Sequence, residues 1–136
     1  MKKPSKADAP EYRLLIAPHL NERTQRYTTR VALETSKPFA AFRYILNVKE
    51  QINGKSILYK VVGLSAPKLS LPSPGPASFS TEYEALKGEY TVSVEGIDGK
   101  VSTFGVRIGP RQVKLTKPVA DGVIEVVTDE HHWPSR

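Results

Sequence analysis

Apolar and polar side chains alternate with a period of two along most of this chain, and this alternation constrains the fold more than any other feature. In residues 26–35 (RYTTRVALET), one face carries Tyr27, Val31 and Leu33, while the other face is charged, small or hydroxylated. A period of two is that of a β-strand, and a strand with one apolar side belongs to a sheet with one face on a core and one in water. The pattern therefore predicts an all-β protein.

Further strands are expected where short alternating or β-branched segments stand between turn residues. They fall at residues 12–16, 39–51, 56–64, 78–83, 113–116 and 123–128, with a long hairpin over 86–108. Asn53-Gly54 predicts a tight hairpin turn, because both residues tolerate positive φ. Residues 66–76 hold four prolines and are expected to form a loop, because proline cannot donate to a strand ladder.

The register of the hairpin over residues 86–108 is predicted by its apolar faces. A two-residue Asp98-Gly99 loop would turn the apolar residues of the second strand toward water, because a one-residue slip moves every side chain to the opposite face. A three-residue loop, 97–99, keeps them on the core and places Gly99 at positive φ. The pairs expected are Val94 with Ser102, Val92 with Phe104, and Tyr90 with Val106.

One pattern in this hairpin, Leu86-x-Gly88-x-Tyr90-x-Val92-x-Val94, resembles the start of strand F in immunoglobulin-like and fibronectin-type domains. The resemblance implies an antiparallel immunoglobulin-like β-sandwich of about seven strands, with room for an extra C-terminal hairpin. It also implies a tyrosine corner, in which the Tyr90 hydroxyl bonds to backbone within residues 84–87. The chain has no cysteine pair, and its single tryptophan, Trp133, lies near the C-terminus. The resemblance therefore concerns the fold, which by itself implies no activity.

The domain organisation expected is a disordered basic arm over residues 1–10, one β-sandwich domain over 11–128, and a flexible tail over 129–136. No segment has the apolar length of a secretory core or a membrane span. The chain also lacks cysteine, which excludes disulfides and thiolate metal sites. A cytoplasmic location and the absence of a membrane span are the default expectations.

The net charge of +6 is concentrated near the N-terminus, where residues 1–30 hold seven basic and three acidic residues. A solvated arm is one interpretation of this excess, and weak binding of nucleic acid or another polyanion is the alternative. The candidate residues for polyanion binding are Lys2, Lys3, Lys6, Arg13, Arg23, Arg26 and Arg30.

No catalytic or metal-binding constellation can be assembled from the sequence. His19 stands alone beside Pro18, and no G-x-S-x-G elbow or glycine-rich phosphate loop is present. His131-His132 follow Asp129-Glu130, but adjacent residues of an extended chain point in opposite directions and do not converge on an ion. We therefore expect no enzyme activity, no cofactor and no metal.

Binding or assembly with another protein is the function that these exclusions favour. A carbohydrate-binding module is a further alternative, and it would need aromatic rings on one exposed face. Phe79 and Tyr83 flank the proline-rich loop and are the rings expected to be most exposed, while Tyr44, Tyr59 and Tyr90 are expected in the core.

Overall fold

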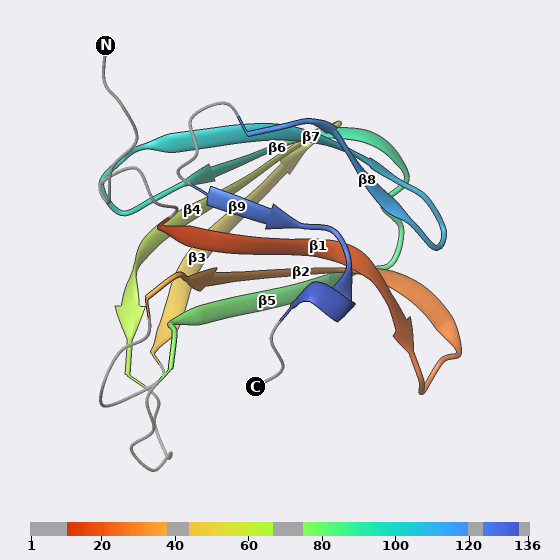
Figure 1. Ribbon diagram of the computed structural model, residues 1–136, viewed down its shortest axis with the longest axis horizontal. Helices are drawn as coiled ribbons and strands as arrows, with labels where there is room; N and C mark the ends of the chain where they lie inside the picture. Colours follow the sequence, from red (N-terminus) through yellow and green to blue (C-terminus); the bar gives the residue numbers. More distant parts are fainter. Residues whose placement is uncertain (1–10, 38–43, 67–74, 120–123, 134–136) are drawn as a thin grey trace.

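The computed structural model describes residues 11–37, 44–66, 75–119 and 124–133, which form nine strands and one short helix (Figure 1). The elements are β1 (Tyr12–Asn21), β2 (Arg26–Thr35), β3 (Ile45–Asn53), β4 (Ser56–Ser65), β5 (Ser78–Tyr83), β6 (Gly88–Glu95), β7 (Val101–Ile108), β8 (Val113–Lys117), β9 (Ile124–Val127) and the 3-10 helix η2 (Glu130–His132). The expectation of an all-β protein is confirmed.

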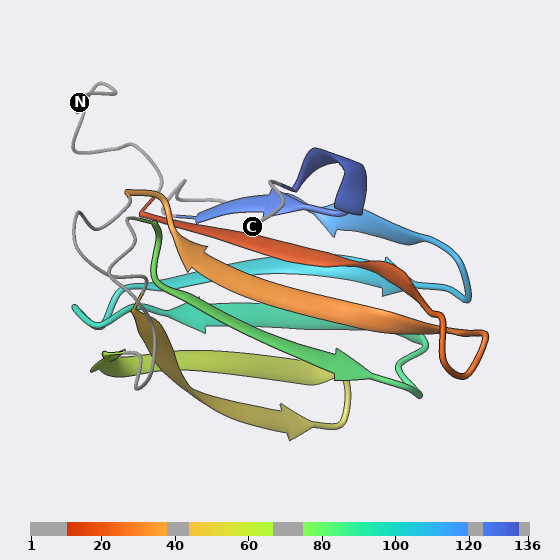
Figure 2. The ribbon, with the colours of Figure 1, turned by 90° about the horizontal axis from the view of Figure 1, so that it is seen from below.

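The strands form one sheet in the order β8-β7-β6-β4-β3-β5-β2-β1-β9. Among the described residues, β3 and β5 pair at Ile45 and Ser78 alone, and beyond this point the sheet curls so that β1 and β2 face β4, β6 and β7 (Figure 2). Their apolar faces enclose a single core that includes Leu14, Val31, Tyr59 and Phe104. The alternating positions seen in the sequence are therefore the positions that face this core.

A mostly antiparallel sheet was expected, and five of the eight strand pairs in the described residues are antiparallel, but a wholly antiparallel sandwich is not confirmed. The pairs β1–β9, β3–β5 and β4–β6 are parallel. The expected C-terminal hairpin is also absent, because β8 pairs with β7 and β9 pairs with β1 at opposite ends of the sheet. Val113 and Ile124 are nevertheless both buried in the core. Each of the two strands thus buries an apolar residue while extending a different edge of the sheet.

The predicted register of the β6–β7 hairpin is confirmed at each of the three pairs. Gly96 N–H donates to the Lys100 carbonyl across a three-residue loop, and Gly99 has a φ of +86°. The β3–β4 hairpin is confirmed as well, but its loop is Gly54-Lys55, because Asn53 pairs with Ser56. Here only Gly54 takes positive φ.

Tyr90 has the surroundings predicted for a corner tyrosine. Its ring is buried, and its hydroxyl accepts a hydrogen bond of 3.3 Å from the Lys87 N–H. The ammonium of Lys55 lies 4.5 Å from the ring centroid and donates to the Lys87 carbonyl at 2.7 Å. These contacts tie the connection between β5 and β6 to the β3–β4 turn.

A second, smaller apolar cluster lies on the outer face of β1 and β2. Leu15, Ala17 and Ala32 are buried there, packed against Val127 and Trp133. The segment Asp129–Trp133, expected to belong to a flexible tail, forms η2 and lies along this face (Figure 1). The flexibility of residues 129–136 stays a prediction, and the basic arm over residues 1–10 lies outside the described residues.

None of the helices in the described ranges is long and apolar enough to cross a membrane.

Candidate functional site

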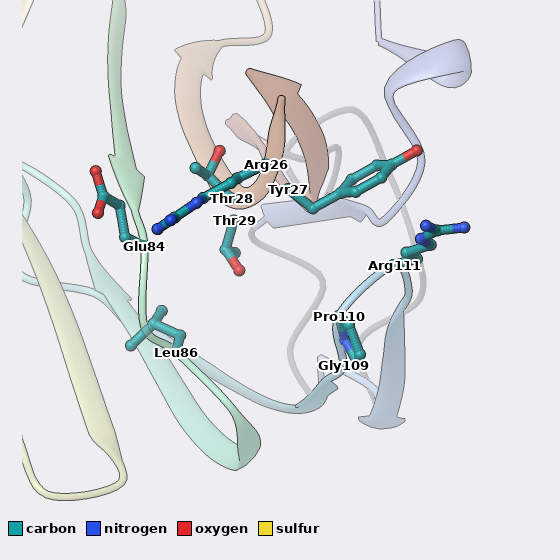
Figure 3. A pocket seen from close by; sticks show the side chains of 9 residues that line it. All are labelled: Arg26, Tyr27, Thr28, Thr29, Glu84, Leu86, Gly109, Pro110 and Arg111. Atoms are coloured by element: carbon teal, nitrogen blue, oxygen red, sulfur yellow. The ribbon is translucent and has the colours of Figure 1, made fainter. Parts of the chain in front are cut away.

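Several connections converge at one end of the curled sheet. They are the β1–β2 turn (22–25), the β5–β6 connection (84–87), the β7–β8 turn (109–112) and the chain after β9. Between the first three lies a hollow of about 360 Å³ (Figure 3). It is lined by Arg26, Tyr27, Thr28, Thr29, Glu84, Leu86, Gly109, Pro110 and Arg111. Loops held on a rigid sheet are a common location for binding residues.

Tyr27 is the central side chain of this site. Tyr27 is 42% exposed, and the guanidinium carbon of Arg111 lies 5.2 Å from the centroid of the Tyr27 ring. Tyr27 and Arg111 border one side of the hollow, and Arg26 extends toward Glu84 on the other (Figure 3). An exposed tyrosine next to an arginine is the kind of pair that anchors protein interfaces. We call Arg26, Tyr27 and Arg111, with Leu20 and Pro110 beside them, the Tyr27 surface.

The β1–β2 turn positions Arg26 and Tyr27 through local hydrogen bonds. The Asn21 side-chain oxygen accepts from the N–H groups of Arg23 and Thr24, at 3.0 and 3.2 Å. The Gln25 N–H donates to the Asn21 carbonyl at 2.8 Å, and Gln25 takes a φ of +59°. Asparagine is suited to such turns because its side chain mimics a backbone acceptor.

The β7–β8 turn positions Arg111 opposite Tyr27. Gly109 N–H donates to the Gln112 carbonyl at 2.8 Å, which closes a tight turn with Pro110 and Arg111 at its centre. The proline ring also fixes φ at Pro110. Arg111 is therefore carried on a short and constrained connection.

Three further hollows share residues with the first. The smallest, of about 250 Å³, is lined by Thr24, Arg26, Tyr27, Thr28 and Glu84, and the other two are larger. One, of about 530 Å³, includes Tyr27 and Arg111 together with Pro18, Leu20 and residues 128–131. The other, of about 580 Å³, lies beside Arg111 along the β7–β8 turn and β8. Residues of the Tyr27 surface thus line each of these neighbouring hollows.

The charges at this end are only partly paired within the described residues. Glu82 accepts from the Thr28 hydroxyl at 2.9 Å, and Glu130 lies 3.1 Å from the Arg30 guanidinium. Arg26 and Arg111 form no ion pair with a described residue, and their guanidinium groups remain open to a ligand. Such groups suit planar acceptors such as carboxylates.

The structure does not gather the candidate polyanion-binding residues into one surface. Arg13 lies 3.2 Å from Glu34 and 3.5 Å from Glu125, with Trp133 over its guanidinium at 5.2 Å. Arg30 pairs with Glu130, so both arginines already have acidic partners. Arg23 and Arg26 are exposed at the β1–β2 turn. Lys2, Lys3 and Lys6 lie outside the described residues.

The histidines form no recognisable catalytic or metal site in the described part of the chain. His19 Nδ1 is 3.0 Å from a Glu130 oxygen, and no described hydroxyl is hydrogen-bonded to its ring. His131 bonds to Asp129 through both its N–H and its ring. No group of three or more histidine, aspartate and glutamate side chains among the described residues could hold a metal ion.

Phe79 and Tyr83, the best candidates for exposed rings, are partly buried. Phe79 packs against the core, with its ring centroid 6.2 Å from that of Tyr59. Tyr83 bonds to the Tyr59 hydroxyl at 3.0 Å and donates to Glu50. Burial raises the pKa of both tyrosines, and the hydrogen bond between Tyr83 and Glu50 raises that of Tyr83 further. These rings face the core because β5 continues the alternation of β2 across the sheet.

Tyr27 was assigned by its periodicity to the core face, and its exposure could not be read from the pattern. It is the second residue of β2, beyond the part of the strand that the opposite layer covers. The signal available in the sequence was its position next to the Asn21–Gln25 turn, since a strand end beside a loop is less covered.

Searches of protein-family models, of curated proteins and of solved structures each found no match to this chain.

Proposed function

We propose that this chain is a non-catalytic protein-binding module that contacts its partner through the Tyr27 surface. The observation that carries the proposal is the exposed Tyr27 ring held beside Arg111 at 5.2 Å, where both residues line two neighbouring hollows. Tyrosine and arginine are enriched among the residues that contribute most to protein–protein binding. Leu20 and Pro110 add apolar area next to them.

Capture of partners from native lysate tests this proposal when wild type is compared with Tyr27→Ala. Tyr27→Ala should lose the proteins that wild type retains, because truncating a central aromatic anchor typically costs about 2 kcal/mol or more of binding energy. Ile97→Ala is the matched control, since Ile97 is 59% exposed on the β6–β7 loop at the opposite end of the sheet. Both variants should melt close to wild type, because neither side chain belongs to the core. Equal capture by all three proteins would contradict the proposal.

The two alternative functions have less support in the described residues. Polyanion binding through Arg13 and Arg30 would have to compete with Glu34 and Glu130. A carbohydrate-binding platform needs several exposed aromatic rings. Among the described aromatic residues, Tyr27 is the one that is largely exposed, at 42%.

An immunoglobulin-like relationship also stays a proposal. The Tyr90 corner contact and the neighbouring order β5-β2-β1, which matches strands E, B and A of that fold, support it. The parallel β4–β6 pair is a departure from that fold's antiparallel sheets.

A further inference from the structure

The segment from the end of β7 to the end of β8 has the largest local excess of basic over acidic residues in the described chain. Residues 107–117 (RIGPRQVKLTK) contain four basic residues and no acidic residue. This local excess is not visible in the overall balance, because residues 110–136 as a whole hold four basic and four acidic residues. We call Arg107, Arg111, Lys114 and Lys117 the basic face.

Strand register places three of these cations on the same side of the sheet. Arg107 lies directly opposite Lys114, and both point away from the core that Val106 and Ile108 enter. Lys117 lies opposite Gly105, where a Cβ would meet the Lys117 Cβ at 3.3 Å, so the lysine side chain covers this glycine. Like charges directly opposite one another destabilise a strand pair, and an anion placed between them would relieve this cost.

The basic face is scarcely neutralised from within the described chain. Arg107 lies 3.5 Å from Glu89, but these side chains are 64% and 61% exposed, so the pair is well solvated. Lys114 and Lys117 form no ion pair with a described residue. On the other side of Arg111, Glu130 is already engaged by Arg30 and His19.

The hollow beside this face combines apolar and cationic walls. It is lined by Arg107, Gly109, Pro110, Arg111, Gln112, Lys114, Leu115 and Thr116, with no acidic residue among them. Leu115 is 43% exposed. β8 is also an end strand whose one strand partner among the described residues is β7. End strands can accept an extended peptide, which adds main-chain hydrogen bonds to side-chain contacts.

We propose, building on the function proposed above, that the protein partner presents an extended acidic segment with interspersed apolar side chains to the basic face. Its carboxylates would meet Arg111, Lys114 and Lys117, and its apolar side chains would contact Leu115 and Pro110. A peptide fits better than a nucleic acid, because single-stranded nucleic acids are bound on aromatic stacking platforms and this hollow has no aromatic lining.

Fluorescence anisotropy with a short labelled peptide of alternating glutamate and valine tests the proposal. Wild type should bind this peptide, more weakly as the salt concentration is raised, and should not bind the matching lysine–valine peptide.

The double variant Lys114→Glu with Lys117→Glu should weaken peptide binding about tenfold or more, because two attractive contacts become repulsive. Lys114→Arg with Lys117→Arg should retain it. Lys49→Glu with Lys100→Glu changes the net charge equally on exposed residues of β3 and the β6–β7 loop, and should stay within about twofold of wild type.

Several outcomes would overturn the proposal. Absence of peptide binding to wild type would do so, as would equal losses in the two double glutamate variants. Tighter binding of a thymidine oligonucleotide with the same residue dependence would assign the face to nucleic acid. Retained peptide binding with self-association of the Lys114/Lys117 glutamate variant would show that these lysines protect a strand edge. Tyr27-dependent capture without peptide binding refutes this inference alone, whereas peptide binding without Tyr27-dependent capture refutes the function proposed for the Tyr27 surface.

Discussion

Replacing Tyr59 by phenylalanine is expected to destabilise the protein at neutral pH and to stabilise it at alkaline pH. Tyr59 is fully buried on β4, and its hydroxyl lies 3.0 Å from that of Tyr83, which in turn donates to Glu50. Burial, together with the hydrogen bond to Tyr83, raises the pKa of Tyr59 well above its usual value of 10. The folded protein therefore holds this proton more tightly than the unfolded chain.

The size of the effect follows from the hydrogen bond and from proton linkage. At neutral pH the variant loses one hydrogen bond and keeps the packing of the ring, so it should be less stable by about 0.5–1.5 kcal/mol. Because the pKa of Tyr59 is higher in the folded protein than in the unfolded chain, the protonated tyrosine stabilises the fold fully at pH values below the pKa of the unfolded chain. This stabilisation is lost as the pH rises above that value. Above about pH 10, wild type should thus lose about 1.4 kcal/mol per pH unit through Tyr59, and the variant lacks this loss. The two stability curves should cross between about pH 10 and 11.

Urea denaturation across this pH range measures both curves. Val61→Ala is the control, because Val61 is a buried neighbour on β4 and the variant retains Tyr59. It should be less stable than wild type by about 1–3 kcal/mol at every pH, with a parallel curve. If the Tyr59→Phe curve also runs parallel to that of wild type, Tyr59 is not kept protonated by its surroundings and the reasoning is refuted.

Three further substitutions test the packing described above. Tyr90→Phe removes the acceptor of the Lys87 N–H, but that bond is 3.3 Å long and Lys87 is exposed, so chemical denaturation should show a loss of only about 0.5–1 kcal/mol, and a loss above about 2 would contradict this. Gly99→Ala should cost about 1–2 kcal/mol, because Gly99 has a φ of +86° and nothing contacts the added methyl; an unchanged melting curve would argue against this loop. Trp133→Ala should speed amide exchange at Leu15 by uncovering the outer cluster, and unchanged exchange would mean that the C-terminal segment protects nothing there.

Local patterning predicted where most strands lie and one of their registers, although β1 (Tyr12–Asn21) continues well beyond the expected residues 12–16. The bounds of β2 and β5 agree with the alternation that predicts them, and the alternation also predicts the β6–β7 register because the second strand of this hairpin has only one apolar face. These features depend on contacts between residues that are close in sequence, so a short stretch of sequence contains all the residues needed to predict them. The Tyr90 contact with Lys87 belongs to the same class, because it spans three residues.

Only the tertiary structure decided how distant strands pair and which residues reach the surface together. The sequence of β9 is equally compatible with pairing to β8 or to β1, because Ile124 and Val126 present an apolar face in either place. Parallel pairing of β4 with β6 likewise depends on how the whole sheet curls around its core. The Tyr27 surface arises from that curl, since Tyr27 and Arg111 are far apart in sequence and meet because the β1–β2 and β7–β8 turns lie at the same end. Periodicity identifies the face of a strand that is apolar, but the layer packed against that face determines how much of the strand is covered.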